Sequence, residues 1–280
     1  MEGQDQQIHN EIQQQESKEI IENNTIENEQ TKDKEIKEET WDTRTKLLVG
    51  NENYEIIQKT SILLLGNHPS FSFASEYLIR AGVMKLTLYY PEMNTNTQHS
   101  LHAFSVNQRN EQDQLLEINP QANIQLIQKQ YNVQLMRTHI SSNDIILIGI
   151  EEEEMLLNAI QIAFELKKKI FVVVGGYGIN DSSKIMVKPL NKIKKGDYML
   201  KLKEKLTAVK IYRKVKLIYT EDGFAFSSQI EENKMNQSFS FVFGVMGTFV
   251  AGEAINSIIV RKPVQTRAIP SASGINDELE

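Results

Sequence analysis

One junction in the chain has the place of a phosphate-binding loop but not its residues. Residues 63–83 read LLLGNHPSFSFASEYLIRAGV, which is an apolar strand followed by an amphipathic helix. Nucleotide-binding folds put a glycine-rich loop at such a junction, because glycines let backbone N–H groups approach the phosphate closely. Here no glycine occurs between Gly66 and Gly82, and Pro69 has no N–H to offer. The junction therefore suits a nucleotide in position but not in composition.

A second candidate is the run of four glutamates that begins at Glu151, directly after the apolar run DIILIGI. Carboxylates bind Mg²⁺ well. Acidic side chains are also favoured at a helix N-terminus by the helix dipole alone. The dipole is the preferred explanation for Glu152, Glu153 and Glu154, and the metal role of Glu151 stays open.

A third candidate is a basic segment between Lys184 and Lys216. It holds twelve Lys and Arg residues against two acids, Asp197 and Glu204, a local charge of +10. Such a concentration is typical of surfaces that bind a phosphate backbone. The alternative is a solvated lysine face, which the shortage of arginine and of interleaved aromatic residues favours.

Composition limits the function classes. The chain of 280 residues has no cysteine, which excludes disulfides, a cysteine zinc site and a thioester carrier. The net charge of the whole chain is −6, and residues 1–40 alone carry −8, so the remainder is slightly positive. Residues 1–40 also contain no aromatic residue. We therefore expect a disordered acidic tail over 1–40, a folded domain over 41–262 and a flexible tail over 263–280.

No segment reads as a membrane span or a signal peptide. The most apolar stretch, residues 241–260, contains Glu253 and Asn256 and is expected to be a buried helix. The N-terminus lacks a basic region followed by an apolar one. We expect a cytoplasmic protein with no membrane partner.

Strands and helices alternate along the domain. Strands are expected at residues 61–65, 85–89, 124–127, 144–150, 170–174, 185–187 and 215–219, and helices at 44–50, 53–59, 73–81, 111–118, 152–167, 198–206 and 238–259. This rhythm predicts an α/β fold, a Rossmann-like doubly wound and mainly parallel sheet with helices on both faces. Ligands of such sheets bind beyond the carboxyl ends of the strands, where the winding reverses.

Short motifs in the right order resemble the ThiF, MoeB and E1-like adenylating superfamily. They are Arg44-Thr, Leu48-x-Gly50, Ala81-Gly82-Val83, Thr95-Asn96-Thr97, Ile118-Asn119-Pro120 and the strand at 144–150. Within the superfamily the chain is most similar to tRNA threonylcarbamoyladenosine dehydratase. That similarity is carried by Gly175-Gly176, by residues 181–192 and 200–206, and by residues 243–253.

The resemblance implies activation of a carboxyl group by ATP and Mg²⁺, with tRNA as the substrate. In the dehydratase the carboxyl belongs to a threonylcarbamoyl group on an adenosine beside the anticodon, and activation lets it cyclise. This chemistry needs a phosphate cradle, a ribose anchor and a carboxylate for the metal. The resemblance also implies a homodimer or a heterodimer with an active homologue.

Carried over by position, the nucleotide machinery is only partly retained. The family loop GxGGVGS keeps Gly66 and Ser72, while its inner glycines are replaced by His68, Pro69 and Phe71. His68 is expected to be an exposed loop residue. The candidate phosphate contacts in this loop are therefore Gly66 and Ser72.

The other carried-over positions are weaker. The ribose-binding aspartate is replaced by Tyr90, with Glu92 two residues on, and Asn96 keeps the asparagine of the NxxRQ element. Arg109 is the available candidate for the family's catalytic lysine, and Glu151 replaces its metal-binding aspartate.

Arg44 matches the arginine that reaches across the family's dimer interface to the partner's ATP. A surface salt bridge to Asp42 or Glu39 is the alternative, and the two are weighed equally.

Three functions follow. The first is a dehydratase dependent on ATP and Mg²⁺ whose activity is weak or lost, with tRNA bound through the basic segment. The second is an inactive subunit that dimerises with an active paralogue or supports ubiquitin-like protein activation. The third is a Rossmann-like binding module without adenylation, which the motifs in the second half disfavour.

Overall fold

The computed structural model describes residues 40–91, 110–211, 214–223 and 239–259. The chain forms two units, Met1–Thr43 and Arg44–Glu280, and the fold below is that of the second. Three predicted site residues, Glu92, Asn96 and Arg109, lie outside the described residues, as do both predicted tails apart from Thr40.

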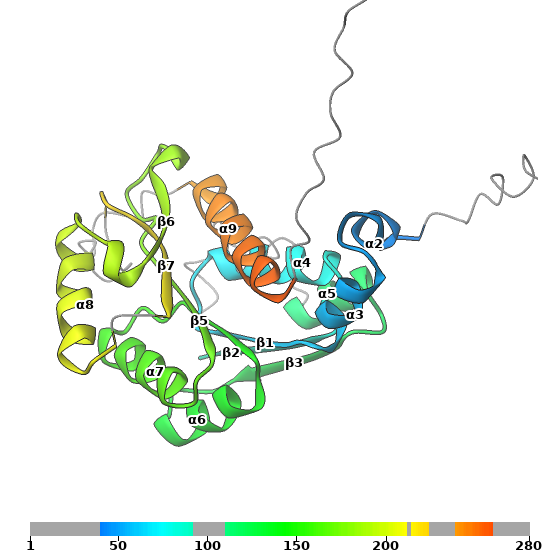
Figure 1. The fold of residues 1–280 in the computed structure, drawn as a ribbon, viewed down its shortest axis with the longest axis horizontal. Coiled ribbons are helices and arrows are strands. Elements are labelled where there is room, and N and C mark those ends of the chain that lie inside the picture. Colours follow the sequence, from blue (N-terminus) through cyan, green and yellow to red (C-terminus); the bar gives the residue numbers. More distant parts are fainter. Residues whose placement is uncertain (1–39, 92–109, 212–213, 224–238, 260–280) are drawn as a thin grey trace, which may run out of the picture. The chain divides into compact units, whose positions relative to one another are not determined.

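The second unit is built on one seven-stranded sheet with the strand order β3-β2-β1-β4-β5-β7-β6 (Figure 1). The strands are β1 Ser61–Leu65, β2 Lys85–Tyr90, β3 Asn123–Gln128, β4 Ile145–Ile148, β5 Lys169–Val174, β6 Ile185–Pro189 and β7 Val215–Thr220. All neighbouring strands pair in parallel except β6 and β7, which are antiparallel. The predicted α/β class and mainly parallel sheet are confirmed.

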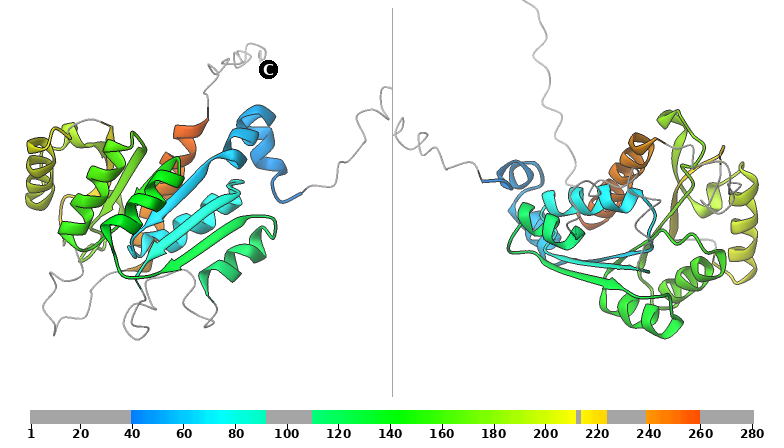
Figure 2. Two further views of the ribbon diagram at one scale, coloured as in Figure 1. Left: turned by 90° about the horizontal axis from the view of Figure 1, so that it is seen from below. Right: turned by 180° about the vertical axis from the view of Figure 1, so that it is seen from behind.

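Helices cover both faces of the sheet. They are α2 Thr43–Val49, α3 Asn51–Lys59, α4 Ser70–Arg80, α5 Glu111–Ile118, α6 Val133–Ser142, α7 Glu153–Glu165, α8 Asp197–Ala208 and α9 Ser240–Ile258, with short 3-10 turns at Ser182–Lys184 and Leu190–Lys192. Helices α3, α4, α5 and α9 pack on one face and α6, α7 and α8 on the other, as Figures 1 and 2 show.

Two helices differ from the sequence expectation. Helix α4 begins at Ser70, three residues earlier than predicted, because Pro69 precedes its first turn without breaking it. Helix α6 was not predicted at all. Its polar face is broad, and its start is marked by Asn132, whose side chain accepts hydrogen bonds from the N–H groups of Gln134 and Leu135.

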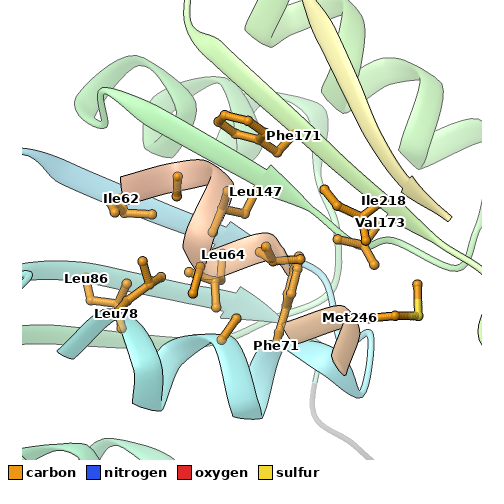
Figure 3. Close-up of a cluster of buried hydrophobic side chains, with 14 of the residues drawn as sticks. Ile62, Leu64, Phe71, Leu78, Leu86, Leu147, Phe171, Val173, Ile218 and Met246 are labelled. Atoms are coloured by element: carbon orange, nitrogen blue, oxygen red, sulfur yellow. The ribbon is translucent and has the colours of Figure 1, made fainter. Parts of the chain in front are cut away.

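Helix α9 is a core helix. It is the one helix of the described segments that is long and apolar enough to cross a membrane. Its residues Val242, Met246 and Val250 are buried in the same core cluster as side chains of the sheet and of α4, and Figure 3 shows Met246 within that cluster. Gly247 allows close contact with α4, because a Cβ there would lie 2.6 Å from the carbonyl oxygen of Ser70.

The winding of the sheet reverses between β1 and β4. Strands β2 and β3 lie on one side of β1, and β4 and β5 on the other. The loop after β1, which starts at Gly66, therefore lies beside the loop after β4, which contains Gly149 and Glu151. This is the place where doubly wound sheets bind their ligands.

Candidate functional site

The crevice between the β1 and β4 loops is closed by backbone contacts. Gly66 has φ +125°, and a Cβ at this position would lie 2.1 Å from the carbonyl oxygen of Gly149. The N–H of His68 donates a hydrogen bond to that same oxygen at 3.2 Å. One of the backbone donors that could have faced a phosphate is thus used to join the two loops.

His68 is buried, contrary to the expectation of an exposed loop residue. Its side chain is 2% exposed. Its Nε2 lies 2.9 Å from the carbonyl oxygen of Gly175, and its Nδ1 lies 3.3 Å from the N of Ser70 and 2.8 Å from the Ser70 hydroxyl. Because a carbonyl only accepts and an amide N–H only donates, Nε2 carries the proton and Nδ1 accepts. The imidazole therefore caps helix α4 from inside the protein.

Three aromatic rings enclose the imidazole. The ring centroids of Phe243 and Tyr177 lie 5.5 Å and 6.0 Å from that of His68 in edge-on arrangements, and Phe71 lies at 6.4 Å. Phe71 belongs to α4, Phe243 to α9, and Tyr177 follows β5. Figure 3 shows Phe71 among the buried apolar side chains between α4 and the sheet. The replaced loop residues are thus part of the core.

The N-terminus of α4 offers little to an anion. The N–H of Ser70 faces His68 Nδ1, and the N–H of Phe71 donates to the carbonyl oxygen of His68 at 2.9 Å. Pro69 has no N–H. The hydroxyl of Ser72 donates to the carbonyl oxygen of Pro69 at 2.9 Å. A helix N-terminus binds phosphate through unpaired N–H groups, so the residues of this loop do not fit a nucleotide triphosphate.

Tyr90, which stands in the sequence where the resemblance implies a ribose-binding aspartate, is hydrogen-bonded to Glu111. The Tyr90 hydroxyl donates to one carboxylate oxygen of Glu111 at 3.1 Å, and the Ser75 hydroxyl donates to the other at 2.8 Å. Burial raises the pKa of Glu111, and the two hydroxyl bonds only partly oppose it. Burial and the Glu111 charge together raise the pKa of Tyr90. Neither residue supplies a positive charge to a phosphate.

The space left between these groups is small. A cavity of about 20 Å³ is lined by residues 66–68, by Phe71 and Ser72 of α4, and by Tyr90 and Glu111. That volume suffices for about one water molecule, whereas ligand pockets typically measure roughly 300–1,000 Å³. The described side of the site is filled.

We expect Glu111→Gln to stabilise the protein in a pH-dependent way. The pKa of Glu111 is higher in the folded protein than in the unfolded chain. At pH values between these two pKa values the folded protein therefore binds more protons than the unfolded chain. The contribution of this group to stability consequently falls as the pH rises through that window. Gln removes the cost of burying the charge. Urea unfolding of both proteins at pH 4 and pH 8 should show a larger gain for the variant at pH 8. An equal difference at both pH values would mean that Glu111 titrates normally.

Glu151 lies after β4 and accepts a hydrogen bond from the hydroxyl of Tyr177. Tyr177 is buried, and burial together with the Glu151 charge raises its pKa well above the usual value. In the described parts of the chain no three His, Asp or Glu side chains gather around a common point. The metal role of Glu151 stays a prediction, and the structure adds a hydrogen-bonding role for it.

Arg44 lies exposed in α2. Its predicted reach to a partner's ATP stays a prediction.

The basic segment is partly neutralised in the fold. Four of its lysines pair with acids that lie outside the segment. These ion pairs are Lys184–Asp222 at 3.0 Å, Lys188–Glu221 at 3.4 Å, Lys205–Glu153 at 2.8 Å and Lys216–Glu253 at 2.5 Å. The segment runs through β6, α8 and the start of β7. Being close in sequence therefore does not place its remaining lysines on one surface.

Comparison with known proteins identifies solved structures with the same fold as this chain. No protein-family model matches this chain, and no curated protein sequence matches it. Among solved structures it is similar to the E. coli tRNA N6-threonylcarbamoyladenosine dehydratase TcdA, with 16% identity, a TM-score of 0.66, and coverage of 78% of this chain and 93% of that chain. The ATP complex of TcdA gives 18% identity, a TM-score of 0.63 and coverage of 78% and 93%.

A more distant likeness is to E. coli MccB with AMPCPP and MccA, at 14% identity, a TM-score of 0.50, and coverage of 80% of this chain and 64% of that chain. Because the match to TcdA covers 78% of this chain, it extends over both halves of the sheet. This chain therefore shares its fold with TcdA, which is consistent with the superfamily resemblance that the sequence motifs indicated.

Proposed function

We propose that this chain is a non-adenylating counterpart of tRNA threonylcarbamoyladenosine dehydratase. In this proposal it works as a binding subunit, dimerises with an active homologue and contributes a tRNA-binding surface. Its own turnover of ATP is weak or lost. The fold supports kinship with an adenylating family, and the filled crevice argues against adenylation by this copy.

The observation that carries the proposal is the buried imidazole of His68. It caps α4 at the place where a phosphate would accept hydrogen bonds from the helix N–H groups. Its ring nitrogens are hydrogen-bonded to Gly175 and Ser70. TcdA has been solved with ATP and with AMP. In this chain a nucleotide would have to displace a core side chain and break the hydrogen bond between His68 and Gly149.

Calorimetric titration of the purified protein with ATP and Mg²⁺ tests the proposal, with TcdA as the positive control. We expect no saturable heat up to millimolar ATP. Micromolar binding, together with ATP-dependent cyclisation of threonylcarbamoyladenosine in tRNA, would instead establish a working dehydratase and overturn the inactive-subunit assignment.

The partner is tested separately by co-purification of the full chain from its own cells. We expect recovery of a homologue that carries the intact GxGGVGS loop. In the mixed dimer Arg44→Ala should lower the homologue's ATP turnover without changing dimer formation. A protein that stays a homodimer and binds no homologue would remove the subunit model.

A further inference from the structure

A basic groove lies at the amino-terminal edge of β5 and β7, away from the crevice described above. These strands run in parallel, so their first residues lie side by side, with Ile170 opposite Val215. The groove has a volume of about 620 Å³. Five lysines line it, namely Lys167, Lys168, Lys169, Lys214 and Lys216. The first three lie outside the basic segment seen in the sequence.

Lysines at this edge occupy backbone conformations that normally select glycine. Lys167, Lys210 and Lys214 have φ values of 56°, 64° and 69°, and in the described ranges they are the non-glycine residues with positive φ. Left-handed backbone is strained for any residue with a Cβ. All three lie in the connections that lead into β5 and β7.

Two of these lysines end helices by the same motif. After α7 the N–H of Lys168 bonds to the carbonyl oxygen of Ala163, and after α8 the N–H of Ile211 bonds to that of Leu206. The left-handed residue of this motif is usually glycine. Gly82 fills it after α4. Lysine at positions 167 and 210 is therefore less favourable for backbone stability than glycine would be, but it places a long cationic side chain at the edge.

The positive charges of the groove are incompletely compensated. Lys168 donates to the carbonyl oxygen of Ser141 at 2.7 Å and Lys169 to that of Ser257 at 2.5 Å, and these neutral acceptors leave the charges in place. Lys216 pairs with Glu253. No acid partner for Lys167 or Lys214 occurs in the described ranges, and both are exposed.

The other acid at this edge is already engaged. Asp144 accepts hydrogen bonds from the backbone N–H and the hydroxyl of Ser61. Its charge also interacts with those of Lys168 and Lys85, so Asp144 offsets part of the positive charge of Lys168 and leaves Lys167 and Lys214 as the uncompensated pair.

We propose that this groove binds the phosphodiester backbone of RNA. Lysines act as point charges that hold phosphates without reading bases, and the lysines that line the groove come from two chain segments, residues 167–169 and 214–216. The inference rests on the tRNA partner of the proposed function and places it on named residues. Because the groove lies at the opposite edge of the sheet from the filled crevice, RNA binding here does not depend on ATP.

Fluorescence anisotropy with an unmodified tRNA transcript tests the groove in the full chain. In Lys167→Gly/Lys214→Gly we expect affinity at 0.1 M salt to fall on the order of tenfold to a hundredfold and the slope of log K against log salt to shrink by about 2. The melting temperature should stay equal or rise, because glycine suits both backbone positions. Reduced affinity would then not result from unfolding.

Lys194→Ala/Lys195→Ala is the matched control. It removes two charges, the same number, from exposed residues of the basic segment that lie outside the groove, so it tests the segment against the groove, and affinity should fall far less than in the groove variant. If the control weakens binding as much as the groove variant, or more, the groove is not the site, although the RNA partner survives. If the wild-type protein binds no tRNA at 50 mM salt, or binds anionic lipid vesicles instead, both the groove inference and the RNA part of the proposed function fail. Neither result bears on ATP binding, which the calorimetric titration decides.

Discussion

Gly66→Ala should abolish stable folding or lower the free energy of unfolding by more than about 4 kcal/mol. The added Cβ would lie 2.1 Å from the carbonyl oxygen and 2.3 Å from the carbonyl carbon of Gly149. Both are backbone atoms at the end of a central strand, so neither can move without separating β1 from β4. Urea unfolding followed by circular dichroism measures the loss.

Gly50→Ala is the control for backbone strain. Gly50 also has positive φ, +79°, but a Cβ there would meet nothing within 4 Å. We expect a loss of about 1 kcal/mol, which is the conformational cost alone. If Gly66→Ala cost no more than Gly50→Ala, the two loops would be separable and the crevice could open for a ligand. The comparison therefore tests the closure of the site and not only the fold.

The sheet could be predicted because its central strands β1, β4 and β5 are nearly continuous apolar runs. Strand β1, Ser61–Leu65, and helix α5, Glu111–Ile118, begin and end at the residues expected from the sequence. Gly82 has positive φ after α4, as a helix stop requires. Helix α6 escaped prediction because it buries only Met136 and Ile140, too few residues to give a clear period.

The state of the site could be predicted only in part. Replacement of the inner glycines indicated that phosphate would not be cradled. Sequence could not show that the histidine turns inward, since that depends on Gly175 and Phe243, which are distant in the chain. One signal for the capping role of His68 was available in the sequence. Pro69-Ser70 marks a helix start, and His68 is the polar side chain directly before it.

The basic segment shows the same limit. Charge counted along 184–216 includes lysines that pair with Asp222, Glu221, Glu153 and Glu253. It leaves out residues 167–169, which the parallel pairing of β5 and β7 brings to the same edge as Lys214. A linear count cannot find a surface made by strand order.

His68→Ala should lower the free energy of unfolding by about 3 kcal/mol or more. The change removes a buried ring that packs against Phe71, Tyr177 and Phe243, and such truncations leave a cavity. It also leaves the carbonyl oxygen of Gly175 and the N–H of Ser70 without their partner, at about 1–3 kcal/mol for each buried group. Urea unfolding at pH 7.5 gives the value.

His68→Gln separates the hydrogen bond from the ring. The glutamine Nε2 can donate to the Gly175 oxygen as the imidazole Nε2 does, so this variant should recover part of the stability while losing the aromatic packing. Equal losses in the two variants would mean that ring packing alone holds the loop.

The alanine variant also tests whether the imidazole alone keeps a nucleotide out of the crevice. Removal of the imidazole frees the Ser70 N–H, but Pro69 still lacks a donor, and the backbone N–H at position 68 still bonds to the carbonyl oxygen of Gly149. Calorimetry should therefore show no ATP binding by the folded variant. If ATP did bind, the site would be a working cradle blocked by a single side chain, and a ligand or partner that moves His68 could restore it.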